Sequence, residues 1–261
     1  MIRLILMVLS ISICGQVYSN DLSVEEIIAR ANQASFYAGD DGRSDARMMI
    51  VDAQGNKQMR QFVIYRKDIM SGEVDNGDQN FLVVFSRPSD VNGTVFLVHK
   101  KAEGDDDRWL YLPALDLEKR IAASDNRSSF VGSDFFYEDV SGRHPKADVH
   151  EVTSQDGDFY AIKSTPKDAD AVEFSYYTMN IDKQTFLPIE VSYFDKQGKK
   201  YRQVEVLKVE EVQGHATVMQ SKVSNLNTGG HTLMAFRNPQ YDVGLTEADF
   251  TSRALKNPPR K

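Results

Sequence analysis

The chain has 261 residues, a formal net charge of −7 at pH 7 and an isoelectric point near 5.3. An acidic chain with no basic patch lacks the electrostatic footprint of a nucleic-acid-binding protein, which excludes that class of partner. Cys14 is the only cysteine, so a hydrophobic core, and not disulfide bonds, has to hold the fold together.

Residues 1–19 predict a secretory signal peptide. Arg3 provides the positive start, residues 4–13 are apolar, and Val17-Tyr18-Ser19 resembles a cleavage site. We therefore expect cleavage after Ser19 and a periplasmic protein of a Gram-negative-type bacterium. Residues 20–261 are then expected to form a single domain.

Two alternatives stay open for this leading segment. An uncleaved anchor is disfavoured because the apolar run is shorter than the roughly 20 residues that a membrane-spanning helix needs. Lipidation of Cys14 is disfavoured because Ile13 precedes it, where a small residue is usual. No later run is long and apolar enough to span a bilayer, so we expect only transient membrane contact.

A helix is predicted at the start of the mature chain. Ser23 and Glu26 have the spacing of a capping box, and apolar residues recur at helical intervals from Val24 to Ala31. Gly39 and Gly42 are predicted to end this helix.

Most of the remaining chain has the pattern of short β-strands. Turn sequences such as Asp90-Val91-Asn92-Gly93 and Asn227-Thr228-Gly229-Gly230 separate the apolar runs. Strands are predicted over residues 47–52, 58–67, 79–87, 94–100, 108–112, 117–122, 149–154, 159–164, 173–182, 188–194, 201–213, 215–226 and 231–239. They form an antiparallel meander, and a last helical element is predicted over 246–255.

Many of these strands have apolar residues on both faces. Phe81, Val83 and Phe85, for example, alternate with Leu82 and Val84. A sheet with one wet face alternates more cleanly, so we expect the sheet to curl until its second face meets either itself or a helix plug. The result is a mainly β fold with an interior, which holds either a ligand or an ordinary packed core.

The segment from Trp109 to Asp139 has the most unusual composition. Its second part, Ser129 to Asp139, places four aromatic rings beside three carboxylates and a glycine, which predicts an ordered loop or short helix. Phe130 and Phe135 are predicted to plug the interior. Asp134 and Glu138 are predicted to cap backbone amides and to pair with Arg120, Arg127 or Arg143.

Catalytic and metal-binding motifs are missing from the sequence. There is no nucleophile elbow, phosphate-binding glycine loop or His-Glu-x-x-His pair. The histidines lack metal-ligand spacing and are scattered over the chain as His99, His144, His150, His215 and His231. Asp105-Asp106-Asp107 lacks the spaced ligands of a calcium loop and is predicted to be a solvated hairpin tip. We therefore predict no enzyme activity, cofactor or metal; a lipid-ester hydrolase using Ser133 or Asp134 is the alternative.

Several pieces of the chain together resemble a known family. They are Trp109-Leu110-Tyr111-Leu112-Pro113, Lys119-Arg120-Ile121, Ser129-Phe130-Val131-Gly132-Ser133-Asp134-Phe135 and Tyr137-Glu138-Asp139, with Arg87-Pro88, Gly93-Thr94 and Leu187-Pro188 on either side. In these pieces the chain resembles the outer-membrane lipoprotein-sorting protein family, the LolA-like group of the LolA–LolB superfamily, in its longer treponemal-type branch. The resemblance covers about residues 23–256.

This resemblance implies a strongly curved antiparallel sheet in an unclosed barrel, or half barrel, with helices against the concave face around a hydrophobic cavity. It also implies a monomeric periplasmic carrier or binding protein for lipid, acyl-chain or lipoprotein cargo in transport toward the outer membrane. An inner-membrane transporter and an outer-membrane acceptor are the implied protein partners. The Ser129 to Asp139 segment departs from the lipoprotein chaperone proper, so the identity of the cargo stays open.

The alternative to a carrier is an accessory module of a resistance-nodulation-division type transporter complex. The residues predicted to line the cavity, from strand pattern alone, are Phe62, Ile64, Phe81, Val83, Phe85, Phe96, Trp109, Tyr111, Phe130, Phe135, Phe174, Tyr176, Met219 and Met234.

Overall fold

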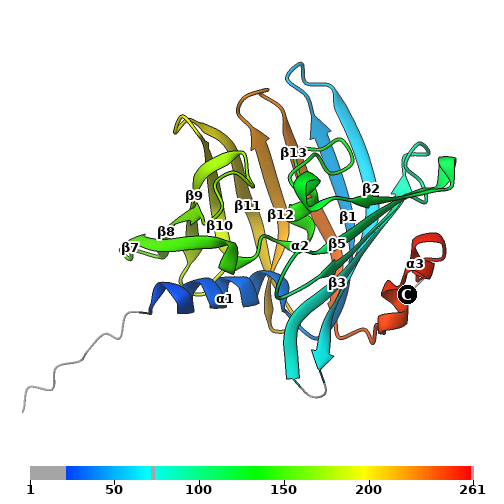
Figure 1. Cartoon of the computed structure of the whole chain (residues 1–261), viewed down its shortest axis with the longest axis horizontal. Helices are drawn as coiled ribbons and strands as arrows, with labels where there is room; N and C mark the ends of the chain where they lie inside the picture. The colour runs from blue at the N-terminus through cyan, green and yellow to red at the C-terminus, as the bar shows by residue number, and fades with distance from the viewer. Residues whose placement is uncertain (1–21, 72–73, 260–261) are drawn as a thin grey trace, which may run out of the picture.

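The computed structural model describes residues 22–71 and 74–259, so the predicted signal peptide lies outside the described residues. A single antiparallel sheet of 13 strands dominates the structure, in the order β6-β5-β4-β3-β2-β1-β13-β12-β11-β10-β9-β8-β7 (Figure 1). The strands are β1 (Asp41–Val51), β2 (Lys57–Ser71), β3 (Val74–Arg87), β4 (Val95–Lys100), β5 (Asp107–Leu112), β6 (Leu117–Ile121), β7 (Asp148–Ser154), β8 (Phe159–Pro166), β9 (Phe174–Asp182), β10 (Pro188–Asp195), β11 (Lys200–Val212), β12 (His215–Asn225) and β13 (His231–Tyr241). Each predicted strand is present, and the predicted mainly β fold class is confirmed.

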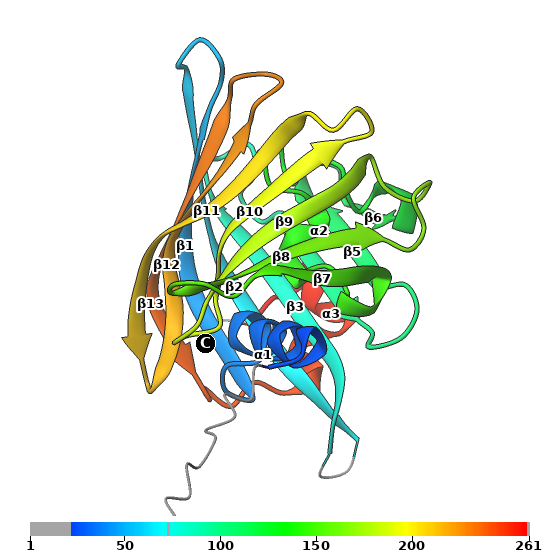
Figure 2. The same cartoon turned by 90° about the vertical axis from the view of Figure 1, so that its left-hand side faces the viewer.

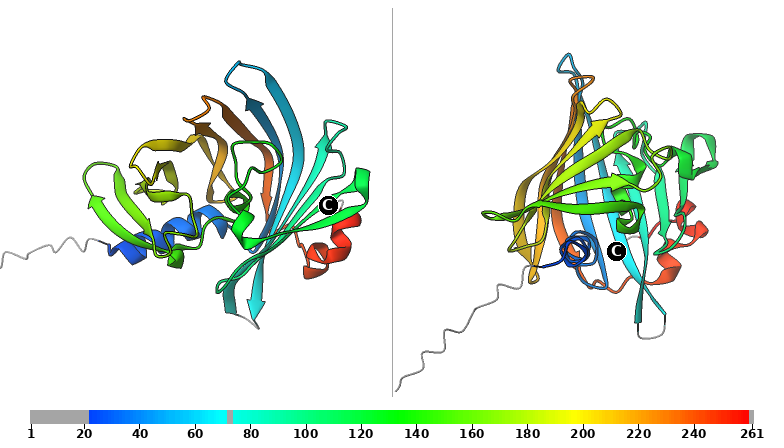
Figure 3. Two further views of the ribbon diagram at one scale, coloured as in Figure 1. Left: turned by 45° about the horizontal axis from the view of Figure 1, so that its top comes forward. Right: turned by 60° about the vertical axis from the view of Figure 1, so that its left-hand side comes forward.

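The sheet curls without closing. Strands β6 and β7 are its two edges, and they do not pair with each other. Figure 2 shows how β7 to β11 curve over helix α1, and the right-hand view of Figure 3 looks along this helix, which lies on the concave side of the sheet. The architecture is therefore an unclosed barrel with a helix against its concave face.

Helix α1 (Val24–Phe36) begins with the predicted capping box. The Glu26 amide donates to the Ser23 hydroxyl, and the Ser23 amide donates to the Glu26 carboxylate. Its apolar stripe, with Ile27, Ile28 and Ala31, packs on the inner face of β8 and β9. Burial of this stripe, more than helix propensity, stabilises the helix.

The predicted end of this helix was wrong. α1 ends at Phe36, and Gly42 belongs to strand β1 instead. The carbonyl of Phe36 accepts hydrogen bonds from the side chains of Arg66 (2.8 Å) and Gln79 (2.7 Å). These side chains satisfy the last carbonyl of the helix, so no glycine cap is needed there.

The outer face of β2 to β5 is covered by the C-terminal segment. The short helices η4 (Glu247–Phe250) and α3 (Ser252–Lys256) occupy the predicted last element. Phe250 and Leu255 pack against Leu82 and Leu97, on the opposite face from the interior. The second apolar face therefore meets this segment, where the sequence had suggested the sheet itself or an internal plug (Figure 1).

The connection from β6 to β7, residues 122–147, crosses the concave side of the sheet and is called here the crossing segment. It contains η2 (Ala123–Asp125), a tight loop, helix α2 (Tyr137–Ser141) and η3 (Pro145–Ala147); η1 (Pro113–Leu115) precedes it, between β5 and β6. Phe130 from the loop packs at a tilt against Phe85 and Phe96, at 5.7 and 5.4 Å between ring centroids. The predicted loop with a short helix is confirmed. No helix among the described residues is long and apolar enough to cross a membrane.

Candidate functional site

A cavity of about 280 Å³ lies on the concave side of the sheet, beneath the end of α1 and the crossing segment. Its walls are Ala34, Ser35, Phe36, Ala38, Gly42, Arg43, Ser44, Phe62, Ile64, Arg66, Phe81, Val83, Phe130, Phe135, Asp139, Val140, Leu187, Ala216, Thr217, Val218, Met234, Phe236, Pro239, Gln240 and Tyr241. Most of these residues are apolar, so the cavity presents an apolar surface to a ligand.

Small residues on facing elements create this space. Strand β1 contributes Gly42 and Ser44, and α1 with the turn after it contributes Ala34 and Ala38. A Cβ atom on Gly42 would lie 3.0 Å from the carbonyl oxygen of Gln240, so the neighbouring strand leaves no room for a side chain there. Because neither wall has a large side chain at these positions, the interior is not filled as an ordinary core would be.

Half of the predicted lining residues do border the cavity. They are Phe62, Ile64, Phe81, Val83, Phe130, Phe135 and Met234. Phe85 and Phe96 belong to the same apolar cluster but lie behind the lining residues. Met219 is next to Val218 on β12 and is not part of the wall.

Four other predicted residues lie elsewhere in the fold. Trp109 and Tyr111 pack on the outer face beneath the C-terminal segment. Phe174 is buried with Tyr177 and Tyr193 beneath the arginines of the crossing segment, and Tyr176 stacks on Phe194 at 4.5 Å. Strand pattern could not separate these positions, because both faces of β5 and β9 are covered.

Sequence reasoning missed the contributions of α1, β1 and β12, and on β13 it found only Met234. The small residues Gly42 and Ser44, two positions apart on β1, were the one visible signal. The other wall residues of β12 and β13 gave none, since their place in the wall depends on how these two strands diverge.

Charged groups in the cavity wall are paired within the protein. The Arg66 guanidinium donates to the carbonyls of Phe36, Ala38 and Gly39 and to the Asp68 carboxylate. Asp139 accepts from the Phe136 amide and from Arg202, whose side chain is buried. The wall therefore offers a ligand little net charge.

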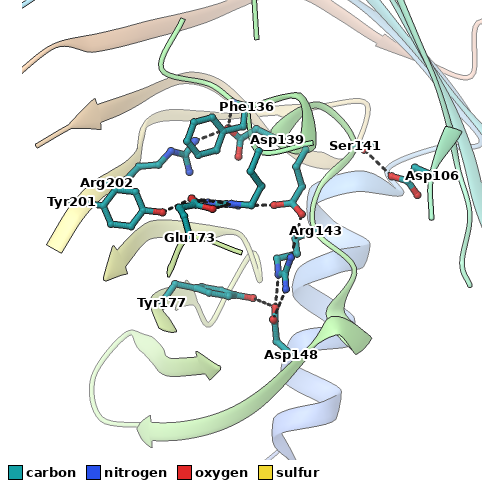
Figure 4. Close-up of polar contacts among 12 residues, drawn as sticks. Asp106, Phe136, Asp139, Ser141, Arg143, Asp148, Glu173, Tyr177, Tyr201 and Arg202 are labelled. Atoms are coloured by element: carbon teal, nitrogen blue, oxygen red, sulfur yellow. Dashed lines mark hydrogen bonds and ion pairs between the residues drawn. The ribbon is translucent and has the colours of Figure 1, made fainter. Parts of the chain in front are cut away.

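The crossing segment is fastened by buried ion pairs, drawn in Figure 4. Glu138 on α2 accepts from Arg127 at 2.6 Å and from Arg143 at 3.2 Å. Arg127 also donates to Glu173, the residue before β9, and Arg143 donates to Asp148 at the start of β7. Burial by itself would lower the pKa of both arginines, but these carboxylates raise it, so both stay charged. Buried charges of this kind are tolerated only when fully paired.

The crossing segment makes only some of the predicted ion pairs. The pairing of Glu138 with Arg127 and Arg143 is confirmed. Asp134 pairs with no arginine among the described contacts; it accepts from the Thr232 hydroxyl, while Asp139 caps α2. Arg120 instead pairs with Asp107 on the outer strands.

A second buried polar cluster joins the crossing segment to β4 and β5. Asp106 has a side chain that is only 1% exposed and pairs with Arg108 and His144. The prediction of a solvated hairpin tip was therefore wrong at this residue. Burial would raise the pKa of Asp106, but the His144 hydrogen bond and the Arg108 charge hold it below its ordinary value.

Lys100 lies at the junction of α1 and α2. Its Nζ donates to the Ser141 carbonyl at 2.8 Å and sits 4.9 Å from the centre of the Phe36 ring. Burial lowers the pKa of this lysine to about 8. The end of α1 and the end of α2 are thus held together by one buried amine.

Ser133, a residue that the alternative hydrolase function would use, makes hydrogen bonds within its own loop. The Ser133 hydroxyl donates to the Phe130 carbonyl at 2.7 Å and accepts from the Phe135 amide at 3.2 Å. His144, the nearest histidine in sequence, contacts Asp106 instead. The described residues contain no group of three or more His, Cys, Asp or Glu side chains placed to hold a metal ion.

Comparisons with known proteins agree with this geometry. A family model described as "Uncharacterized protein" matches residues 77–257. A search of curated proteins found no match. Among solved structures, a DUF1329 family protein from Desulfovibrio piger is 32% identical, with 88% of this chain and 96% of that chain covered and a TM-score of 0.79.

Two further structures extend the comparison. An outer membrane lipoprotein-sorting protein domain from Vibrio parahaemolyticus is 26% identical, with 89% and 96% of the two chains covered and a TM-score of 0.77. A LolA superfamily protein from Nitrosomonas europaea is 13% identical, with 89% and 99% covered and a TM-score of 0.69, a likeness of fold. The predicted LolA-like fold is thus confirmed, and the chain belongs to the DUF1329 family.

Proposed function

We propose that the protein is a non-catalytic periplasmic carrier that holds an apolar chain of a lipid-like or lipoprotein cargo in this cavity, on its way toward the outer membrane. The observation that carries the proposal is the cavity itself, which is mostly apolar and whose charged wall residues, Arg43, Arg66 and Asp139, are paired within the protein. Cleavage of residues 1–19 as a secretion signal, and a single monomeric domain from residue 20 onward, are parts of the same proposal.

The volume of the cavity limits how much of the cargo it can hold. Typical ligand pockets measure about 300–1,000 Å³, so a cavity of about 280 Å³ suits one chain better than several. Each buried methylene contributes about 0.8 kcal/mol to binding. A single, partly buried hydrocarbon chain would therefore bind strongly enough to be shielded from water and weakly enough to be released to an acceptor.

The test is a binding assay on protein purified without detergent. Native mass spectrometry identifies any lipid that co-purifies, and titration with a fluorescent acyl probe measures affinity. Ser44→Leu fills the cavity beside Ile64, its partner across the strands, and should abolish binding. Ser154→Leu, at the far edge of the sheet on β7, is the matched control and should bind as wild type does.

Two results would count against a carrier. One is wild-type protein that neither co-purifies with lipid nor takes up the probe. The other is a Ser44→Leu variant that remains folded and binds the probe with unchanged affinity, since the ligand would then sit elsewhere.

A further inference from the structure

Strands β12 and β13 separate beside the cavity. Each strand has 11 residues, yet their ladder runs only from Gln220↔Ala235 to Ser224↔His231. Among the described residues, the register of these two strands pairs none of residues 215–219 with any of residues 236–241. The sheet is therefore split along half the length of these two strands.

An irregularity in β13 explains the split. Arg237 faces Asp45 on β1 and Gln240 faces Arg43, so β13 uses one residue more than β1 over this stretch. Asn238 adopts the left-handed conformation, with φ 50°, in this bulge. A bulge bends its strand, and the following Pro239 has no N–H to donate to a ladder. Strand β13 thus stays with β1 and leaves β12.

Both edges of the split form part of the cavity wall. Ala216, Thr217 and Val218 come from β12, and Phe236, Pro239, Gln240 and Tyr241 come from β13. The cavity therefore reaches the gap between the strands, where most of the side chains that border it are apolar or small.

Side chains close the far end of the split, opposite the ladder. The Gln213 side-chain amide donates to the Tyr241 carbonyl at 3.1 Å, and the Tyr241 amide donates to the Gln213 side-chain carbonyl at 2.8 Å. The hydroxyls of Thr217 and Tyr241 are 2.8 Å apart, and the His215 ring packs edge-on against Tyr241. We call Gln213, Thr217 and Tyr241 the clasp.

The other boundaries of the cavity are fastened more strongly. The end of α1 is held by Arg66, Gln79 and Lys100, and the crossing segment by the buried ion pairs of Arg127 and Arg143. Opening either boundary would leave buried charges unpaired, which is costly. Opening the clasp exchanges a few neutral hydrogen bonds for bonds to water.

We propose that the split between β12 and β13 is the portal through which the apolar chain of the cargo enters and leaves the cavity, and that the clasp controls this passage. The inference rests on the proposed carrier function and adds the route. An uncharged hydrocarbon chain is the occupant, because the gap is continuous with the apolar cavity and the charges of the cavity wall are already paired.

Stopped-flow kinetics of an anthroyloxy-labelled fatty acid test this proposal on the full-length mature protein. Gln213→Ala removes two hydrogen bonds of the clasp, and Tyr241→Phe removes the hydroxyl contact. Entry and exit rates should both rise about fivefold or more in Gln213→Ala, which is the change that one net hydrogen bond of typical strength produces. Equilibrium affinity should change by less than about threefold, because the bound state keeps its contacts.

Tyr111→Phe is the matched control, since its hydroxyl bonds to Asp116 on the outer face of the sheet. Its rates should equal those of wild type. If wild type binds the probe but both clasp variants exchange it at the wild-type rate, or no faster than the control, the portal is overturned and the carrier function stands. If wild type binds no probe, both proposals fail.

Discussion

Replacing Phe130 by Ala tests whether the crossing segment is a structural plug of the barrel. Phe130 is 2% exposed, and its ring contacts those of Phe85, Phe96 and Tyr137 at centroid distances of 5.4 to 5.7 Å. Truncating a buried Phe to Ala costs about 3–5 kcal/mol. Three aromatic partners place the expected loss at about 4 kcal/mol or more.

This loss is a large share of a typical domain stability of about 5–15 kcal/mol. Urea denaturation followed by circular dichroism measures it, with the slope of the unfolding free energy against urea as a check that the same surface is exposed. Phe159→Ala is the control, because Phe159 is 39% exposed and should lose less than about 1 kcal/mol. Phe130→Ala also enlarges the cavity, so acyl-probe binding should not weaken in molecules that remain folded.

A Phe130→Ala variant within about 1 kcal/mol of wild type would refute this reasoning. Such a result would mean that the loop of the crossing segment can leave the barrel at little cost. The segment would then act as a movable lid and not as a fixed plug.

Three other predictions concern the groups that hold the interior together. Glu138→Gln leaves Arg127 and Arg143 short of one buried carboxylate and should lower the unfolding free energy by about 3 kcal/mol; a loss below about 1 kcal/mol in urea denaturation would contradict the role of this pair. Gly142→Ala places a Cβ 2.4 Å from the Phe36 ring, so its thermal midpoint should fall well below that of Gly157→Ala, which has a similar positive φ but open space around it. Lys100 has a pKa of about 8 in the folded protein against an ordinary value of 10.5. Between these two pH values the unfolded chain binds more protons than the folded protein, so the free energy of unfolding should rise with pH, by about 3 kcal/mol at most. Lys100→Met lacks this dependence, and a difference between the two proteins that stays constant from pH 8 to pH 10 would contradict it.

Local patterns in the sequence were enough to locate the elements of the fold. Alternating apolar runs with glycine-containing turns between them predicted every strand, since period-two patterning and turn chemistry are local properties. Where local signals misled, a distant partner was responsible. The glycines after α1 did not cap it because Arg66 and Gln79, from β2 and β3, satisfy its last carbonyl. The three aspartates at the start of β5, Asp105 to Asp107, do not all face water because His144, far along the chain, contacts Asp106.

The sequence by itself thus determined a curved, mainly β fold of the LolA-like type, with apolar residues on both faces of its strands. Only the tertiary structure decided which face of each strand lines the interior and which lies beneath the C-terminal segment. The C-terminal segment covers Trp109 and Tyr111 on the outside, while Phe130 of the crossing segment covers Phe85 and Phe96 on the inside. Both faces of these strands have apolar residues. An apolar residue in the sequence predicts that its side chain is buried, but it does not predict which element covers it. The cavity and the split beside it depend on how β12 and β13 diverge, a property of long-range register that no local pattern contains.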